Sequence, residues 1–274
     1  MDIIRSIDTM HALALGWRAR GKKVGFVPTM GFLHRGHTTL IELMRQRCEI
    51  LVVSIYVNPL QFAAGEDLSR YPRDFEGDRE KCRAAGCDVL FMPENLYPAD
   101  FRTTVDVSGL TSRWEGAARP THFRGVATVV CRLFGLVQPT VAMFGEKDFQ
   151  QFTVLQSMAR DLAMGIEIVP GPLVRDHDGL ALSSRNVFLS PDDRRRALSL
   201  HRALFAMRDA TTRSAADRVA LGTSILDCDA LDYLDIVDPD SLDPVAEIDR
   251  PLRAIATARY GKTRLLDNVA IFPA

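Results

Sequence analysis

Ile50-Leu51-Val52-Val53-Ser54-Ile55-Tyr56-Val57 is a continuous, mostly apolar run in the first quarter of this 274-residue chain. It has the length of a strand, is rich in β-branched residues and shows no polar alternation, which is typical of a strand buried on both faces. Such strands occur in parallel sheets that helices cover on both sides. The run therefore predicts an α/β protein.

The segments around this run alternate between strand and helix patterns. Strands are expected at 24–27, 88–92, 140–144 and 166–169, and helices at 38–48, 75–85, 125–137 and 149–164. This order predicts a Rossmann-like, doubly wound parallel sheet with helices on both faces. In such sheets ligands bind beyond the carboxyl ends of the strands, so polar residues that follow a strand become site candidates.

The pattern changes after Pro170-Gly171-Pro172. Ser190-Pro191-Asp192-Asp193 combines a Ser N-cap, a Pro at the first helical position and acids in the first turn, which indicates a helix start. Helices are expected at 192–210 and 215–228, and strands at 231–237, 252–260 and 265–271. We therefore expect a Rossmann-like domain at 1–173 and a smaller α+β domain at 174–274.

The composition excludes several classes of protein. Hydrophobic residues make up 47% and charged residues 25%, which is ordinary for a globular protein, and the formal net charge is -1. Without a basic excess, binding to nucleic acid by electrostatics is not expected. The five cysteines include no C-x-x-C pair, which favours reduced thiols in the cytoplasm. Neither a signal peptide nor a membrane-spanning run is expected.

Pro28-Thr29-Met30-Gly31-Phe32-Leu33-His34-Arg35-Gly36-His37 follows a predicted strand and opens a predicted helix. Free backbone N–H groups and the helix dipole favour an anion at such a place. His34 and His37 are three residues apart, so they can share one face of the first turn and donate to phosphate oxygens. Two alternatives remain: one exposed and one packed histidine, or a zinc pair, for which no further Cys/His cluster supplies ligands.

Polar residues also follow two other predicted strands. Asn58 and Gln61 come after 50–57, and amides suit hydroxyl and carboxylate groups of a ligand. A plain polar turn set by Pro59 is the alternative. Lys147, after 140–144, could clamp a phosphate, and Gln151 lies one helical turn beyond it. The alternative there is a solvated charged turn.

Leu182-Ser183-Ser184-Arg185 lies near the expected domain boundary. Two hydroxyls and a guanidinium suit a phosphate-binding loop. An ordinary Ser-rich loop is the alternative.

Several stretches resemble one known family. The His-x-Gly-His motif at 34–37 is shared by adenylyl-transferring nucleotidyltransferases and class I aminoacyl-tRNA synthetases. The longer stretches resemble the pantothenate synthetase (pantoate–β-alanine ligase, AMP-forming) family, in that family's order: 28–37, 54–62, 71–73, 115–116, 119–126, 144–151 and 179–186. The resemblance implies ATP-dependent joining of (R)-pantoate to β-alanine through pantoyl adenylate, and a homodimer. Because the labile adenylate must be kept from water, the smaller domain is expected to close as a lid. The composition adds a cytoplasmic location and no nucleic-acid or membrane partner.

The resemblance also implies roles for residues. Catalytic groups would be His34, His37, Lys147 and Arg185. Contacts to ATP would come from Met30, Gly31, Phe32, Leu33, His34, Arg35, Gly36, His37, Gly145, Glu146, Lys147, Asp148, Val174, Leu182, Ser183, Ser184 and Arg185. Pantoate would be bound by Met30, Asn58, Gln61 and Gln151, and β-alanine by Gln61.

Mg²⁺ would accompany ATP. The family often places acidic magnesium ligands in the segment that here reads Glu76-Gly77-Asp78. The glycine breaks the acidic run, which leaves Asp78 as the candidate ligand.

Two other functions remain open. A nucleotidyltransferase that keeps the nucleotide in its product, such as a phosphopantetheine adenylyltransferase, would use the same motif. A catalytically silent nucleotide-binding regulator would keep the fold, although the intact His34, His37, Lys147 and Arg185 speak against it.

Overall fold

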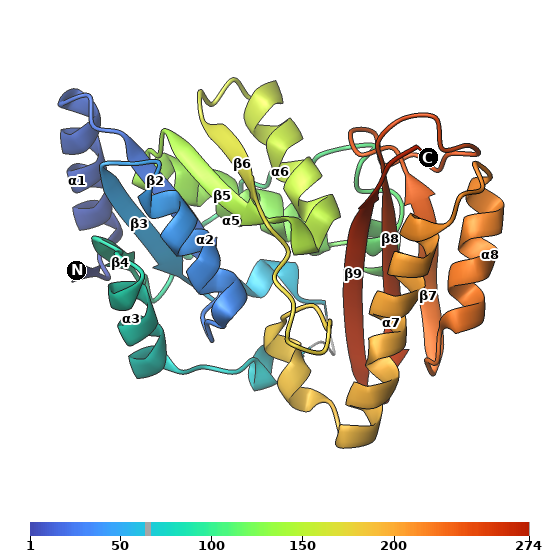
Figure 1. Ribbon diagram of the computed structural model, residues 1–274. Helices are drawn as coiled ribbons and strands as arrows, with labels where there is room; N and C mark the ends of the chain where they lie inside the picture. The colour runs from blue at the N-terminus through green and yellow to red at the C-terminus, as the bar shows by residue number, and fades with distance from the viewer. Residues whose placement is uncertain (64–66, 274) are drawn as a thin grey trace. The chain divides into compact units, whose positions relative to one another are not determined.

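The computed structural model describes residues 1–63 and 67–273. The chain divides into two compact units (Figure 1). The first contains Met1–Glu146 and Val154–Pro172, and the second contains Lys147–Thr153 and Leu173–Ala274. Each unit has a sheet of its own. Within the described part of the chain, no helix is both long and apolar enough to cross a membrane.

The first unit is built on a six-stranded sheet in the order β1-β4-β3-β2-β5-β6. The strands are β1 (Asp2–Ile4), β2 (Val24–Thr29), β3 (Ile50–Ile55), β4 (Val89–Phe91), β5 (Val141–Gly145) and β6 (Glu167–Gly171). Every pair of neighbours runs parallel. The predicted doubly wound α/β fold is therefore confirmed.

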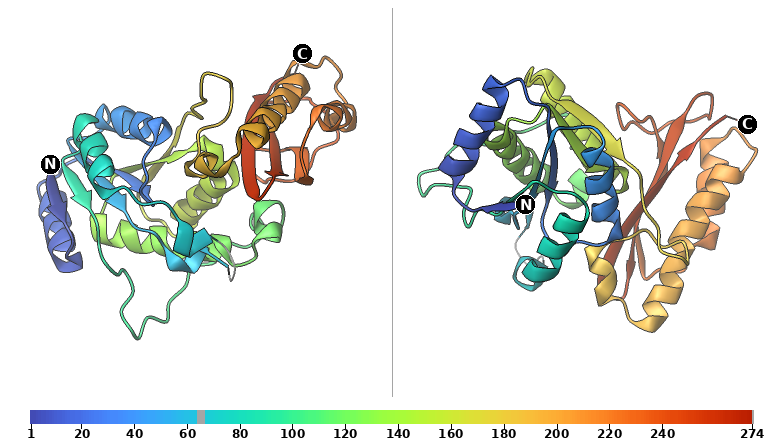
Figure 2. Two further views of the ribbon diagram at one scale, coloured as in Figure 1. Left: turned by 90° about the horizontal axis from the view of Figure 1, so that it is seen from below. Right: turned by 60° about the vertical axis from the view of Figure 1, so that its left-hand side comes forward.

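Helices cover both faces of this sheet. They are α1 (Ile7–Ala19), α2 (Arg35–Arg45), α3 (Phe75–Ala84), α4 (Glu115–Ala118), α5 (His122–Val137) and α6 (Phe149–Asp161). Helices α2 and α3 pack together on one face, and α1 and α5 pack together on the other. The left-hand view of Figure 2 shows α2 and α3 on one side of the sheet and α5 on the other.

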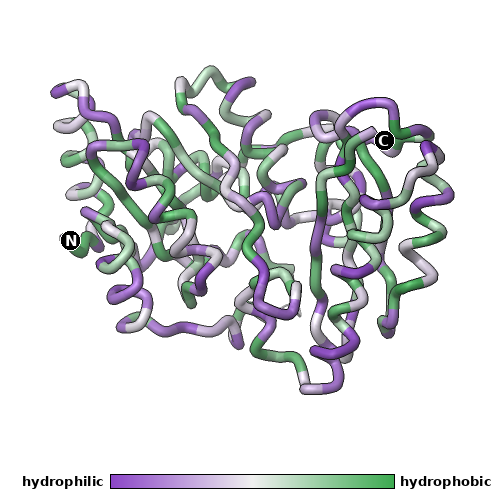
Figure 3. Tube along the Cα trace, viewed as in Figure 1, coloured by the Kyte–Doolittle hydropathy of each residue, from purple (hydrophilic) through white to green (hydrophobic). Residues whose placement is uncertain are grey.

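The central strands are apolar because both of their faces are buried. Leu51, Val52 and Val53 of β3 have no exposed surface, and Figure 3 shows hydrophobic residues along the strands of this sheet. Strand β2 pairs with β3, the next strand in the sequence, on one side and with β5 on the other. Ligands bind at such a switch point, beyond the carboxyl ends of the strands. The segment after β2 therefore has the position that a site requires.

Several boundaries differ from the sequence prediction. Strand β1 and helix α1, which Ser6 caps through its hydroxyl, were not expected. Strand β2 continues through Pro28, which is in register with Ser54 of β3, while the pairing of β2 with β5 is limited to Gly25 and Phe26. Strand β6 likewise contains a proline, and it lies at the edge of the sheet, where a missing N–H is tolerated.

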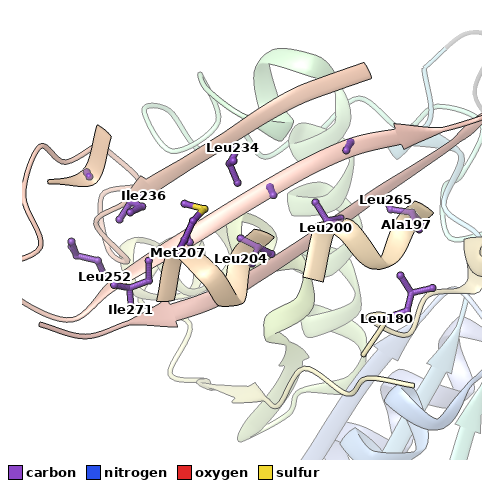
Figure 4. Close-up of a cluster of buried hydrophobic side chains, with 14 of the residues drawn as sticks. Leu180, Ala197, Leu200, Leu204, Met207, Leu234, Ile236, Leu252, Leu265 and Ile271 are labelled. Atoms are coloured by element: carbon purple, nitrogen blue, oxygen red, sulfur yellow. The ribbon is translucent and has the colours of Figure 1, made fainter. Parts of the chain in front are cut away.

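The second unit packs two helices against an antiparallel sheet in the order β7-β8-β9. Its elements are α7 (Pro191–Asp209), α8 (Ala215–Ile225), β7 (Ala230–Val237), β8 (Leu252–Tyr260) and β9 (Thr263–Ile271). Leu200, Leu204 and Met207 of α7 lie in one buried cluster with residues of the strands, among them Leu234 and Leu252 (Figure 4). This unit therefore has its own hydrophobic core.

Candidate active site

The loop between β2 and α2 has an unusual backbone. Gly31 and Phe32 both have positive φ angles, 85° and 51°. The left-handed region is costly for a residue with a side chain, so the Phe32 conformation requires support from its surroundings. The support includes the Thr29 hydroxyl, which accepts from the Gly31 N–H (3.2 Å) and donates to the Ser54 carbonyl (2.8 Å).

Asp78 of α3 binds the next two amides of this loop. Its Oδ2 accepts from the Phe32 N–H (2.7 Å) and its Oδ1 accepts from the Leu33 N–H (2.6 Å). The side chain is nearly fully buried. Burial raises the pKa of the Asp78 carboxyl, against the lowering effect of the two amide hydrogen bonds.

His34 and His37 complete the start of α2. His34 is the N-cap residue, and its Nδ1 accepts from the Gly36 N–H (3.1 Å). The His37 Nδ1 accepts from the His34 N–H (3.3 Å), and the two ring centroids are 4.1 Å apart. A neutral imidazole that accepts at Nδ1 carries its proton at Nε2. Both rings therefore present Nε2–H donors.

These bonds correct the expectation of free amides at the start of α2. Protein acceptors already bind the N–H groups of five loop residues: Gly31, Phe32, Leu33, His34 and Gly36. With these amides occupied, the two imidazoles become the candidate donors of this loop for an anion. The Leu33 side chain lies in the hydrophobic core, so it anchors the loop, and exposed Arg35 pairs with Glu42 (3.2 Å).

The assignment of Asp78 as a magnesium ligand gains no support from this geometry. Each carboxylate oxygen is engaged by a backbone amide. Among residues 1–63 and 67–273, no group of three or more His, Cys, Asp or Glu side chains is placed to hold a metal ion. The arrangement favours an anchoring role for Asp78.

Asn58 and Gln61 lie in the 3-10 turn that follows β3, and both are buried. The Asn58 Oδ1 accepts from the Leu60 N–H (3.3 Å) and from the Tyr97 hydroxyl (2.8 Å). Its Nδ2 donates to the Gly125 carbonyl (3.1 Å) and to the Gln61 Oε1 (3.1 Å). The Asn58 amide thus has four partners within the protein. These bonds suit a residue that positions Gln61. The expected contact of Asn58 with pantoate stays a prediction.

The same bonds orient the Gln61 amide. The Leu60 N–H can only donate and the Gly125 carbonyl can only accept, so they fix the orientation of Asn58. The Gln61 atom that faces the Asn58 Nδ2 must then be the oxygen. The Gln61 Nε2 therefore faces Met30, with its sulfur at 3.0 Å. Gln61 and Met30, two of the residues expected at pantoate, are brought together, and Gln61 presents N–H donors.

Helix α5 holds the backbone of Gln61. The Gln61 carbonyl lies 3.0 Å from the His122 Nδ1 and accepts from Arg119 (3.3 Å), which pairs with buried Glu115. A Cβ on Gly125 would overlap the backbone carbonyl of Leu60. Sequence analysis did not assign Gly125 or Tyr97, because their contacts join segments that are far apart in the sequence.

Of the other candidates, Gly145 at the end of β5 and Glu146 belong to the first unit, and the rest belong to the second. Residues 146–148 form a 3-10 turn before α6, and the Lys147 Nζ lies 3.2 Å from the Asp148 Oδ1. The Lys147 carbonyl accepts from the Asn268 Nδ2 (2.8 Å). Gln151 follows in the first turn of α6, and its side chain is half-buried.

The Ser-rich loop has a defined local structure. The Leu182 N–H donates to the Val174 carbonyl (3.0 Å), and Ser183 caps the 3-10 turn Ser184–Phe188 by accepting from the Arg185 N–H (3.2 Å). This cap holds successive residues of the loop in one turn. That the candidates of the two units meet around one ATP stays a prediction.

Comparisons with known proteins agree with this fold. The family model described as pantoate-beta-alanine ligase matches residues 2–270. Pantothenate synthetase of Thermus thermophilus is 49% identical over 278 residues, which cover 98% of this chain and 100% of that protein. A crystal structure from the same organism has a TM-score of 0.94 at 48% identity and full coverage of both chains.

A more distant structure carries ligands. The pantoate-beta-alanine ligase of Francisella tularensis, complexed with beta-gamma ATP and beta-alanine, has a TM-score of 0.82 at 29% identity. The match covers 98% of this chain and 97% of that one. With the family match over residues 2–270, these likenesses extend over both units. The chain belongs to the pantoate–β-alanine ligase family.

Proposed function

We propose that this chain joins (R)-pantoate to β-alanine and cleaves ATP to AMP and pyrophosphate. The observation that carries the proposal is the pairing of two kinds of donor in the first unit. His34 and His37 offer Nε2–H groups at the switch point of the sheet. Beside the same loop, Gln61 faces Met30 with its amide nitrogen. Such neutral donors suit a phosphate and a carboxylate, respectively.

The reaction has two steps. The pantoate carboxylate attacks the α-phosphorus of ATP, which forms pantoyl adenylate and releases pyrophosphate. The β-alanine amine then attacks the acyl carbon, and AMP leaves as pantothenate forms. Gln61 orients pantoate, and the imidazole donors of His34 and His37 stabilise the charge that develops on the phosphates. Such steps require positioning and charge stabilisation.

Residues of the second unit complete the proposal. The Lys147 ammonium, the Ser183 and Ser184 hydroxyls and the Arg185 guanidinium are suitable donors for phosphate oxygens. Gln151 would bind pantoate. A labile acyl adenylate has to be kept from water, which is the reason to propose that the second unit acts as a lid.

Mg²⁺ is proposed to enter as the MgATP complex. The Asp78 carboxylate is engaged by two amides, so the described residues do not supply a carboxylate cage for the ion. Mg²⁺ in nucleotide sites is commonly held by substrate phosphates and water with few protein ligands. The ion is therefore treated as part of the substrate.

The test is a product analysis in two stages. Pantoate and MgATP alone should release about one pyrophosphate per site, and addition of β-alanine should release AMP together with an amide. An adenylylated product in place of free AMP would instead support a nucleotidyltransferase of the phosphopantetheine type. No turnover with either acceptor would support the silent regulator.

We also propose a homodimer in the cytoplasm. All five cysteines are free thiols, as expected in a reducing compartment. The family resemblance alone supports the dimer. Light scattering at micromolar concentration tests it, and a mass near 30.5 kDa would contradict it.

A further inference from the structure

We propose that Asp78 is a positioning residue for the phosphate-contacting histidines. Its carboxylate occupies the loop amides that an anion would otherwise bind, and this fixes where His34 and His37 present their donors. The inference rests on the proposed function. It assigns Asp78 to the protein's own loop and not to a metal ion.

The geometry of the contact between Asp78 and the loop suits an anchoring role. Two carboxylate oxygens meet two successive amides, Phe32 at 2.7 Å and Leu33 at 2.6 Å, from a helix about 45 residues away in the sequence. Asp78 is only 2% exposed. A buried carboxylate is costly unless it is hydrogen-bonded, and charge-assisted bonds to amides are among the strong ones. The carboxylate and the loop therefore depend on each other.

The loop needs such an anchor because of its backbone. Gly31 and Phe32 are both left-handed, and a conformation of this kind persists only where the surroundings hold it. A Cβ on Gly31 would lie 3.1 Å from the Asp78 Oδ2 and 3.0 Å from Ile55. The backbone therefore approaches Asp78 more closely than is usual for a residue with a side chain.

The anchor also sets what the loop can offer to a ligand. The negative charge of Asp78 lies where a phosphate would lie in a loop that binds anions through its amides. A phosphate is therefore excluded from the Phe32 and Leu33 amides. It is left to the imidazoles of His34 and His37, which the next amides of the same loop orient. The position of these two rings thus depends on Asp78.

The experiment compares Asp78→Asn with Glu76→Gln over a range of Mg²⁺ concentrations. Glu76 lies in the same turn of α3, is exposed and pairs with Arg79 (2.6 Å), so it is a matched acidic control. In Asp78→Asn one acceptor becomes an NH₂ group that faces a backbone N–H. A displaced catalytic group can cost about 100-fold in rate. We expect that loss in kcat/KM for ATP at every Mg²⁺ concentration, with little change for Glu76→Gln.

Amide hydrogen exchange of residues 30–37 is the readout that general destabilisation would not reproduce. Exchange there should accelerate in Asp78→Asn while the core strands β2 and β3 stay protected. Restoration of activity by excess Mg²⁺ would make Asp78 a metal ligand and overturn the inference, as would a variant with wild-type activity. If the wild-type enzyme makes no pantothenate, the proposed function fails, and the exchange measurement still tests the anchor.

Gly31→Ala tests the same contact with Asp78 intact, also if Asp78→Asn does not fold. The added methyl presses on the Asp78 Oδ2 and on Ile55 and strains the left-handed backbone at this position. Exchange at residues 32–33 should therefore accelerate, and kcat/KM for ATP should fall. Combined with Asp78→Asn, the two losses should be far less than multiplicative, because both variants break one contact. Multiplied losses, or wild-type exchange in Gly31→Ala, would overturn the inference.

Discussion

Asp78 and Arg218 are buried ionisable side chains in different units, and both bind backbone groups. Asp78 accepts two amides of the loop before α2. Arg218, in α8, donates to the carbonyls of Met207 (3.0 Å), Arg208 (3.2 Å) and Thr212 (2.7 Å). They are 2% and 1% exposed.

The difference lies in what each side chain holds. Asp78 holds a left-handed loop that carries the histidine pair of the proposed site. Arg218 holds the last carbonyls of α7 and the turn that leads to α8, where no candidate site residue lies. Carbonyls at a helix C-terminus lack partners within the helix and favour a cation. Burial and backbone pairing therefore do not by themselves mark a functional charge. The segment that the charge orders decides its role.

Arg218→Met should have the largest effect, and on stability alone. Three carbonyls lose their donor, one in a buried bond and two in part-buried bonds. A buried group left without its partner costs about 1–3 kcal/mol. We expect a loss of about 2–4 kcal/mol in the free energy of unfolding, measured with urea, and near wild-type kcat for the folded fraction.

Arg202→Met is the control, because Arg202 is an exposed residue of the neighbouring helix α7. It should change stability by less than about 0.5 kcal/mol. A stable Arg218→Met enzyme with lowered kcat would contradict the conclusion that Arg218 serves stability alone.

His37 should show the opposite behaviour, with a kinetic effect. His37→Asn keeps an acceptor near the position of Nδ1, which caps the His34 N–H, but has no Nε2–H. His37→Gln keeps a donor near Nε2 and lacks that acceptor. We expect His37→Asn to slow pyrophosphate release by about 100-fold, the cost of losing one preorganised donor, and His37→Gln to slow it less.

Single-turnover pyrophosphate release measures this step. Preformed pantoyl adenylate with β-alanine should restore much of the second step in both variants, because no pyrophosphate has to leave. Equal damage to both steps would mean that His37 serves the fold, like Arg218.

Gly125→Ala should damage both stability and substrate use. The methyl group would overlap the Leu60 carbonyl and push on the turn that carries Gln61. Overpacking of this kind costs about 1–3 kcal/mol. The KM for pantoate should rise more than that for ATP. Gly135→Ala, in the same helix with open space around it, should stabilise the protein by up to about 1 kcal/mol. Equal effects on both substrates would contradict the role of the turn.

The sequence predicted the helices and strands better than the hydrogen bonds between distant segments. The buried run at 50–57, the helix start at Ser190 and the histidine pair have local patterns, and each lies in the element or at the boundary where it was expected. The anchor on Asp78 joins residues about 45 positions apart, and Asn58 reaches Tyr97 and Gly125. No local pattern encodes such pairs. An amide after a strand signals a site, but not whether the fold has already used its bonds.

Tyr97→Phe should have a small effect, because it removes one hydroxyl and keeps the ring. Burial raises the pKa of Tyr97, so the hydroxyl stays protonated and donates to Asn58. The loss of one such bond costs about 1 kcal/mol, which is a factor of about five. We expect that factor in KM for pantoate, with kcat and the KM for ATP little changed. A change in the KM for ATP alone would contradict the role of Tyr97 in orienting Gln61.

The smallest effect is a difference in titration between Asp78 and Asp176. Hydrogen bonds from His177 and Arg194 lower the pKa of Asp176, at the surface of the second unit, to about 2. Burial raises the pKa of Asp78 above the ordinary value of about 3.9. The signs of the two contributions to stability are therefore opposite. The Asp176 contribution is present above the unfolded pKa and is lost as the pH falls toward 2. The Asp78 contribution is present below the unfolded pKa and is lost as the pH rises through the folded value.

In an NMR titration from pH 6 downward, the amide signals of Phe32 and Leu33 should shift first, and the His177 amide should shift only near the acid limit. The same order of shifts in Asp78→Asn would show that the early shift does not come from Asp78. Asp78 could then not be compared with Arg218 as a second buried charge.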